Sequence, residues 1–176
     1  PSAREEPVGV LFARPGTRVK LGFGAGILGF RSLLLNSQGA ETKESALGAG
    51  FSIRPGTSFA RTSFLSAVDM WNLDESRMRE LREFAIENQR LNDLHSRAAV
   101  ELEGARKSRD EKRWGDFVKH TRAAFGLESR AYPDVKATQN DVVHGIIFFM
   151  ALVLPCAYFT ERLLITASTI KNQILG

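Results

Sequence analysis

Residues 142–160 form an apolar stretch without Asp, Glu, Lys or Arg, and this stretch most constrains what the chain can fold into. As an α-helix rising about 1.5 Å per residue it would extend about 28 Å, close to the ~30 Å hydrocarbon core of a bilayer. The core helix of a small soluble domain carries a recurring polar stripe, whereas polar side chains here are confined to His144, Cys156 and Thr160. The stretch predicts one transmembrane helix; the alternative is a buried helix of a soluble domain.

Two adjacent charges, Glu161 and Arg162, end the apolar stretch. Such a pair is costly at a bilayer centre and suits the membrane–water boundary, so residues 161–176 are predicted to form an interfacial tail. Pro155 lacks a backbone donor and is expected to kink the helix, a distortion that membrane helices tolerate.

The length and charge of the chain narrow its function. Its 176 residues suffice for one ordinary domain and a membrane segment. Because the chain begins with Pro1 rather than Met, we expect it to be part of a longer protein. The net charge of +4 is spread without a basic block, so no nucleic-acid partner is predicted. The single cysteine, Cys156, excludes an internal disulfide.

Short aliphatic and β-branched runs alternate with turn residues over residues 1–62, which predicts a β-rich region belonging to a larger domain. The sequence Arg14-Pro15-Gly16-Thr17 recurs as Arg54-Pro55-Gly56-Thr57, which suggests two equivalent turns, although Pro-Gly pairs are common. Residues 38–50 are small and polar and are predicted to be a loop. The expected strands are Val8–Phe12, Val19–Phe23 and Ile27–Leu35.

Residues 24–29, Gly24-Ala25-Gly26-Ile27-Leu28-Gly29, match the G-x-G-x-x-G pattern of dinucleotide sites. That motif places a pyrophosphate at the N-terminus of a helix that begins at the glycines. Only Phe30–Leu35 follows before a break at residues 36–39, which is too short for the helix of a βαβ unit. The pattern therefore predicts a β-turn between two strands, and no cofactor is predicted.

Helical periodicity begins at Ser63, and residues 63–132 are predicted to form a long helical hairpin. Residues 63–71 are expected to form a short helix, and Asn72, three residues before Glu75, to cap a long one. An apolar stripe at spacings of three and four runs along this long helix: Leu81, Phe84, Asn88, Leu91, His95, Ala98, Leu102 and Ala105.

A second helix is predicted from Trp114 to about Arg130 and is expected to end at Pro133. A turn near residues 108–113 would fold it back on the first helix. Residues 133–141 are predicted to be a short linker, after which Asn140 or Asp141 caps the membrane helix. The face expected to pack on the first helix holds Trp114, Phe117, Val118, Thr121, Ala124, Phe125 and Glu128.

No pattern predicts catalytic, cofactor-binding or metal-ligating residues, so the chain is predicted not to be an enzyme. The sequence contains no H-x-x-x-H metal pair, no G-x-S-x-G nucleophile elbow and no G-x-x-x-x-G-K-[ST] phosphate loop. His95 is predicted to be a hydrogen-bonded histidine between packed helices. The carboxylates of the long helix each have a basic residue one turn away, so they are predicted to lie on a solvated face.

Several short strings, in this order, resemble large bacterial membrane proteins of the FtsX-like (MacB-type) permease class, in which an extracytoplasmic helical hairpin leads into the first membrane span. The resemblance implies an ABC-transporter-related permease subunit of the bacterial inner membrane, with its N-terminal part extracytoplasmic. It also implies further spans and an ATPase on a separate polypeptide. The strings are Leu33-Leu34-Leu35-Asn36, Val68-Asp69-Met70-Trp71, Arg130-Ala131-Tyr132-Pro133-Asp134-Val135, Asn140-Asp141-Val142-Val143, Leu154-Pro155 and Glu161-Arg162-Leu163-Leu164.

The predicted architecture is α+β and mostly α, with a β-rich region, a helical hairpin, a linker, one transmembrane helix and an interfacial tail. We expect the coupling region and first span of an FtsX-like permease, involved in transport or mechanotransmission, with the lipid bilayer and a separate ABC ATPase as partners. One alternative is a membrane-anchored structural or binding module without a transport role. Another is the tail of a hydrolase domain that lies N-terminal to Pro1.

Overall fold

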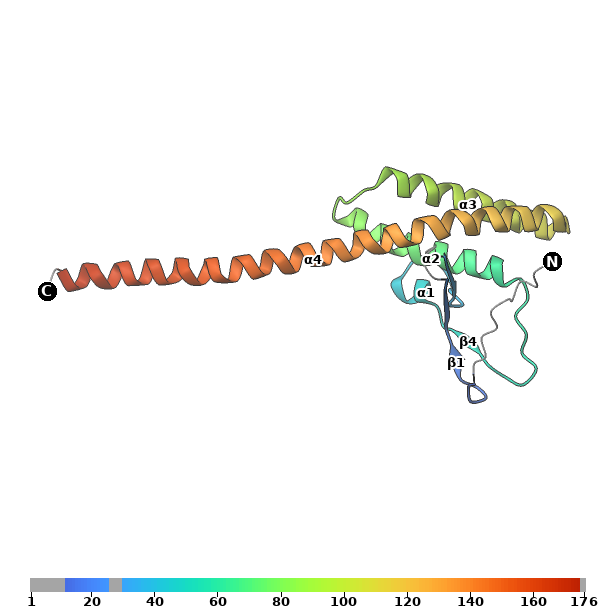
Figure 1. The fold of residues 1–176 in the computed structure, drawn as a ribbon, viewed down its shortest axis with the longest axis horizontal. Coiled ribbons are helices and arrows are strands. Elements are labelled where there is room, and N and C mark those ends of the chain that lie inside the picture. Colours follow the sequence, from blue (N-terminus) through green and yellow to red (C-terminus); the bar gives the residue numbers. More distant parts are fainter. Residues whose placement is uncertain (1–11, 26–29, 175–176) are drawn as a thin grey trace, which may run out of the picture. The chain divides into compact units, whose positions relative to one another are not determined.

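The computed structural model describes residues 12–25 and 30–174. It is a mostly helical α+β fold with small N-terminal strands and a long C-terminal helix (Figure 1), which confirms the predicted fold class. The chain divides into two units, Pro1–Val135 and Lys136–Gly176, which are described separately. The elements in chain order are β1 (Arg18–Val19), β2 (Leu21–Ala25), β3 (Phe30–Leu34), α1 (Lys43–Leu47), β4 (Phe51–Ser52), α2 (Thr62–Glu83), α3 (Gln89–Asp110) and α4 (Trp114–Ile174).

The strands form two antiparallel pairs, β1 with β4 and β2 with β3. In the second pair Leu21 lies opposite Leu34, and Ala25 lies opposite Phe30. The glycine-rich pattern therefore connects two paired strands, as predicted, although residues 26–29 themselves lie outside the described residues. The strand expected at Val8–Phe12 also falls outside them, except for Phe12, which is not in a strand.

The repeated Arg-Pro-Gly-Thr sequence makes two equivalent turns. The Thr17 amide donates to the Arg14 carbonyl at 3.0 Å, and the Thr57 amide donates to the Arg54 carbonyl at 3.0 Å. The third residue of each turn is a glycine with positive φ, 83° and 78°, as a type II turn with proline in second place requires. Because one turn precedes β1 and the other follows β4, the two turns lie at the same end of the β1–β4 pair.

The loop prediction for residues 38–50 is wrong at its centre, where α1 forms. Thr42 and Ser45 make a reciprocal capping box: the Thr42 side chain accepts from the Ser45 amide at 3.1 Å, and the Ser45 hydroxyl accepts from the Thr42 amide at 3.1 Å. Ala46 is fully buried. Capping together with burial outweighs the weak helix propensity of this small, polar segment.

The long helix predicted from Asn72 is wrong, because α2 ends at Glu83 and α3 begins only at Gln89. Ala85 adopts a left-handed φ of 56°, which breaks the helix. Asn88, expected within the stripe, instead caps α3, and its side chain accepts from two backbone amides of the first turn. Asn72 is not a cap. It lies inside α2, and its side-chain Nδ2 donates to Ser37 Oγ at 2.8 Å.

The predicted helix end at Pro133 and linker over residues 133–141 are also wrong as local structure, since α4 is helical throughout this segment. A proline inside a helix costs about 3 kcal/mol through its missing amide and its clash with the preceding turn. Ala131, Tyr132 and Val135 are buried next to Pro133, and their packing offsets that cost. Asn140 and Asp141 therefore lie within a helix and cap nothing.

The core of the first unit lies between α2, α3 and the first part of α4. One cluster joins Leu102 and Ala105 of α3 to Phe64 of α2 and Phe117 of α4. A second joins Met78, Leu91, Ala131 and Val135, and a third joins Met70, Leu73 and Tyr132. The buried stripe on α3 and its packing against the start of α4 confirm the predicted hairpin, seen in Figure 1 as two neighbouring helices.

Candidate functional site

A buried ionic network joins the three helices of the first unit. Its centre is His95 on α3, whose Nδ1 lies 3.0 Å from Glu128 Oε1 on α4 and whose Nε2 lies 3.1 Å from Glu75 Oε2 on α2. Ionised carboxylates only accept hydrogen bonds, so both ring nitrogens donate and the imidazole is positively charged. One side chain thereby links α2, α3 and α4.

Trp71 holds the imidazole ring in place. The two rings stack with centroids 4.9 Å apart and an interplanar angle of 3°. The indole Nε1 also donates to the backbone carbonyl of His95 at 3.3 Å. The stacking fixes the orientation of the imidazole plane, so its two N–H groups remain aimed at Glu128 and Glu75.

Asp74 extends the network beside Glu128, and both side chains are completely buried. Burial and the nearby Glu128 carboxylate both favour the protonated form of Asp74. Asp74 Oδ2 and Glu128 Oε2 are buried without a hydrogen-bond partner among the described residues. Arg77 donates to Asp74 Oδ1 at 3.3 Å, and its guanidinium lies 5.1 Å from the centre of the Tyr132 ring.

The network shifts the proton affinities of its members in opposite directions. Burial lowers the pKa of His95, but hydrogen bonds to Glu128 and Glu75 outweigh it and raise the pKa to about 9. Burial, followed by repulsion from Glu128, raises the pKa of Asp74 to about 8. The hydrogen bond from His95 lowers the pKa of Glu75, whereas burial raises the pKa of Glu128. At neutral pH the Asp74–Glu128 pair therefore keeps one proton and His95 is charged.

Most of these charges are paired. His95 and Arg77 each place a positive charge beside the carboxylates of Glu75 and Glu128 or the Asp74 carboxyl group, and Arg82 adds a further positive charge at Glu75. Buried charges are tolerated when they are paired and hydrogen-bonded. The arrangement fixes three helices at one point, and the pockets formed within residues 97–130, 61–122 and 146–154 are lined by side chains other than those of the network.

A second carboxylate, Asp69 of α2, fastens the end of β3 to the helices. Its Oδ2 accepts from the Leu35 amide at 2.6 Å and the Asn36 amide at 3.1 Å. Its Oδ1 accepts from the amide and the hydroxyl of Ser37 at 2.8 and 2.6 Å. Ser66, one turn earlier, accepts from the Leu33 amide at 3.1 Å. The strand pair is thus attached to α2 through buried side chains.

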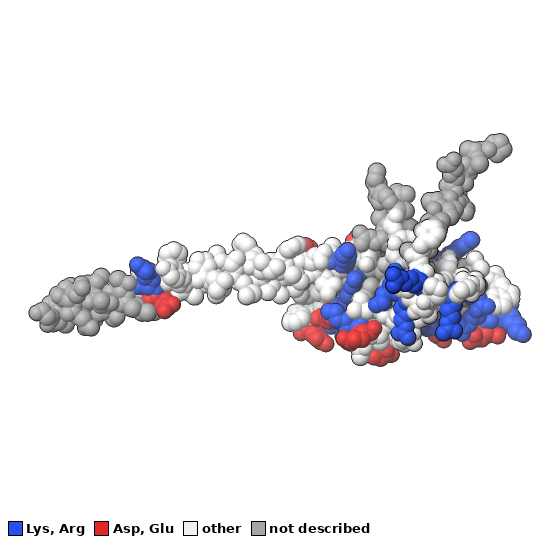
Figure 2. Space-filling model, turned by 90° about the horizontal axis from the view of Figure 1, so that it is seen from below, with Lys and Arg blue, Asp and Glu red and all other residues white. Residues whose placement is uncertain are grey.

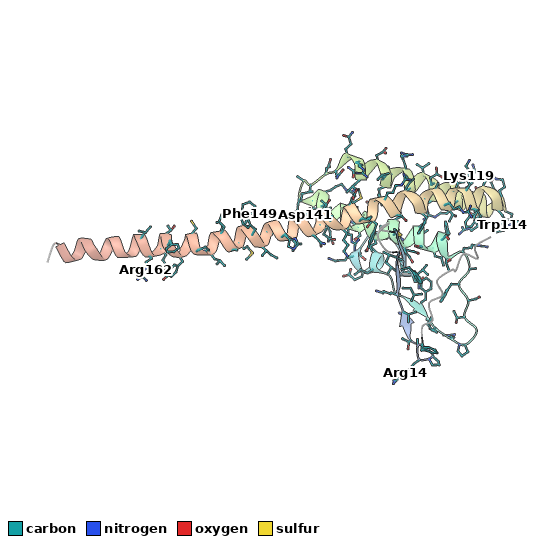
Figure 3. The ribbon with its side chains drawn as sticks, viewed as in Figure 1. Arg14, Trp114, Lys119, Asp141, Phe149 and Arg162 are labelled. Atoms are coloured by element: carbon teal, nitrogen blue, oxygen red, sulfur yellow. The ribbon has the colours of Figure 1, made fainter. Side chains whose placement is uncertain are left out.

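The apolar segment of α4 dominates the second unit. It holds the one helix stretch, within the described residues, that is long and apolar enough to cross a membrane; its 18-residue window has a mean hydropathy of 2.2 and is not buried at all. Phe148 and Leu152 are both more than half exposed. Figure 2 shows this stretch as a rod without charged side chains, and Figure 3 labels Asp141 and Arg162 on either side of Phe149.

The outcome for the predicted residues is mixed. His95 is a hydrogen-bonded histidine between packed helices, as predicted. The solvated face predicted for the carboxylates is wrong for Asp74, which is fully buried, and for Glu75, which is three-quarters buried and pairs with Arg82 at 2.7 Å. The sequence signal that could have revealed the network was Glu128, a carboxylate on the otherwise apolar helix face that was predicted to pack against the helix carrying His95. Among the described residues no group of His, Cys, Asp or Glu is arranged to hold a metal ion.

Comparison with protein-family models, with curated proteins and with solved structures finds no match to this chain.

Proposed function

We propose that this chain anchors a folded helical unit to a lipid bilayer through residues 142–160 and couples that unit to the membrane. The observation that supports the anchor is the unburied apolar window of α4. Burying one large apolar side chain is worth about 1.5–3 kcal/mol, and many such side chains here are exposed. An apolar surface of this extent in water favours association, whereas lipid covers it without cost. The exposed side chains include Ile146, Ile147, Phe148, Phe149, Met150, Leu152, Val153, Leu154, Tyr158 and Phe159.

Two features support a coupling role. The helical backbone of α4 continues through residues 136–141, between the part that packs in the core and the apolar segment. Within the first unit, Glu128 ties the same helix to His95 of α3. A helix that is fixed by buried charges and that continues into a membrane span transmits displacement better than a flexible linker does, because backbone hydrogen bonds resist extension.

On the resemblance to FtsX-like permeases we further propose that the folded unit is extracytoplasmic, in the bacterial inner membrane. In this proposal the apolar segment is the first span of a permease whose ATPase is a separate polypeptide. The module would then pass the conformational state of the spans to the extracytoplasmic side, in transport or mechanotransmission. An anchored binding module without a transport role is the alternative outcome of the experiments below.

Membrane partition tests the anchor. The tagged chain should remain in the membrane fraction after alkaline carbonate extraction. Phe148→Arg combined with Leu152→Arg should move it to the supernatant or to aggregates, since each arginine near the centre of a span costs about 3 kcal/mol. Phe84→Arg combined with Val100→Arg is the matched control, because both side chains are exposed in the first unit. Extraction of the unaltered chain by carbonate would contradict the anchor.

Purification of the full-length natural protein in mild detergent tests the permease assignment. We expect an ABC ATPase to copurify. Four glycines inserted between Lys136 and Ala137 should make the ATPase activity independent of the extracytoplasmic unit. The same insertion between Gln38 and Gly39, outside α4, is the control. If membrane anchoring is retained but no ATPase copurifies, the chain is an anchored module and the permease proposal fails.

A further inference from the structure

The first unit carries an open groove between α3 and α4, on the surface beside the ionic network. It has a volume of about 330 Å³, within the range of small-ligand sites. Three arginines line it, one from α3 and two from α4: Arg97, Arg122 and Arg130. Glu101, Ala123, Gly126 and Leu127 complete its lining. We call it the arginine groove.

The pairing of the two helices explains how the arginines converge. His95 contacts Glu128 and, further along α3, Glu101 contacts His120, so α3 and α4 run antiparallel. In this register Arg97 falls opposite Gly126. Arg122 and Arg130 stand four residues before and after Gly126, about one helical turn on either side along the same face. The three arginines therefore line one groove together with Gly126.

These positive charges have few ion-pair partners among the described residues. Neither Arg122 nor Arg130 has an ion pair or hydrogen bond to another described residue, and Arg97 has only an exposed pair with Asp93 at 3.6 Å. The one carboxylate in the groove, Glu101, accepts a hydrogen bond from His120 Nδ1 at 2.7 Å. The groove keeps a net positive charge, with guanidinium forks of the geometry that suits phosphate oxygens.

Gly126 leaves room for a ligand between the arginines. A Cβ atom placed on it would meet no atom within 4 Å. Glycine within a helix costs roughly 1 kcal/mol relative to alanine, and neither a positive φ nor a close backbone contact requires it here. The absent side chain leaves open space at this point of the groove.

We propose that the arginine groove binds a phosphate ester. The arginines hold the phosphate oxygens above Gly126, the free oxygen of Glu101 accepts from a hydroxyl of the ligand, and Leu127 contacts its carbon skeleton. A phospholipid headgroup and a soluble sugar or glycerol phosphate present the same chemistry. This site is independent of the proposed function, because it is tested in detergent without a bilayer.

Isothermal titration of the full chain in dodecyl maltoside separates the two sources. One arm uses glycerol 3-phosphate and the other uses short-chain phosphatidylglycerol. Saturable binding in the first arm identifies a soluble ester, and saturable binding in the second alone identifies a lipid headgroup. Arg122→Gln and Arg130→Gln should each weaken binding about tenfold, the effect of losing about 1.4 kcal/mol. The proposal would be overturned if neither ligand gave a saturable binding isotherm.

Gly126→Glu is the decisive variant. It places a carboxylate among the three arginines, so it should abolish binding while leaving the melting temperature equal to or above that of the parent chain. Gly115→Glu is its matched control, since Gly115 also lies in α4 with open space at its Cβ position. Lys119→Gln controls for the loss of one exposed positive charge. Unchanged binding by Gly126→Glu, or equal weakening by Lys119→Gln and Arg130→Gln, would refute the groove.

Discussion

His95 donates from Nδ1 to Glu128 Oε1 across 3.0 Å, and both side chains are buried. This bond joins α3 to α4, and the second ring nitrogen joins the same residue to Glu75 of α2. Because one imidazolium serves three helices, its loss affects the whole unit rather than one surface.

Replacing His95 by leucine should lower the free energy of unfolding by about 3–5 kcal/mol, because Glu128 loses the cation that compensates its buried charge. Urea unfolding of the full chain in detergent, followed by tryptophan fluorescence, measures the change. His120→Leu, which removes a partly exposed partner of Glu101, should cost less than about 1 kcal/mol.

Removing both partners should be milder than the sum of the single changes. His95→Leu combined with Glu128→Leu leaves neither group buried without a partner, so the double-mutant cycle should show a favourable coupling of about 1–3 kcal/mol. Additive single changes would show that the pair contributes no coupling to stability.

Stability should fall as the pH rises from 6.5 to 9. The pKa of His95 is about 9 in the folded protein against 6.5 for the free side chain, so its contribution is complete below pH 6.5 and is lost as the pH approaches 9. The pKa of Asp74 is raised from 3.8 to about 8, so the folded state retains a proton that the unfolded chain releases, and stability also falls between these values. Both shifts leave the folded state with more bound protons than the unfolded chain, so they act in the same direction.

The Asp74→Asn variant separates the two contributions. Its urea midpoint should fall less than that of the parent chain between about pH 4 and 6, because only Glu128 then contributes a raised carboxyl pKa there. The urea midpoint of this variant should still fall between pH 6.5 and 9, where His95 titrates. A midpoint that rises with pH across this upper window would contradict the raised pKa of His95.

Asp69→Ala should release the end of β3 from α2. Four donors, three amides and the Ser37 hydroxyl, lose their acceptor, which should cost about 2–4 kcal/mol. Limited proteolysis should show faster cleavage within residues 36–50, and urea unfolding should show the loss of stability. Asp93→Ala, at an exposed position, should change the free energy of unfolding by no more than about 0.5 kcal/mol. It should leave the rate of cleavage within residues 36–50 unchanged.

Two glycines with similar left-handed φ angles should respond differently to alanine. Gly56 has φ +78° and open space around its Cβ position, so Gly56→Ala should cost only the backbone strain, about 1–2 kcal/mol. At Gly48, with φ +70°, the Cβ would lie 2.2 Å from the Leu35 carbonyl oxygen. Gly48→Ala should therefore cost clearly more, and equal urea midpoints for the two variants would contradict this packing.

Cys156 is a natural probe of the proposed membrane span, because it is the single cysteine and is exposed. In intact membranes a membrane-impermeant maleimide should leave it unlabelled, and it should become reactive after unfolding in detergent. The control replaces Cys156 by alanine and exposed Val118 by cysteine, in the first unit. Labelling of Cys156 in membranes at the rate of the control cysteine would contradict a lipid-buried segment.

The sequence predicted the elements whose signals are local or periodic. The Arg-Pro-Gly-Thr turns, the hairpin across residues 24–29 and the buried stripe from Leu91 to Ala105 follow from residues near one another in the chain. His95 on that stripe already indicated a buried hydrogen bond. Its partners remained unpredicted because Glu75 and Glu128 lie 20 and 33 residues away, and helical spacing alone paired each carboxylate with a basic residue one turn away.

By itself the sequence determined that residues 142–160 are an uncharged apolar helix of membrane-spanning length, since length and composition are sums over consecutive residues. Only the tertiary structure decided that the helix breaks after Glu83 and continues through Pro133. In both places a local preference of a few kcal/mol competes with burial and hydrogen bonds to distant segments. The proton that Asp74 retains has the same origin, because only folding brings two carboxyl groups from different helices together out of water.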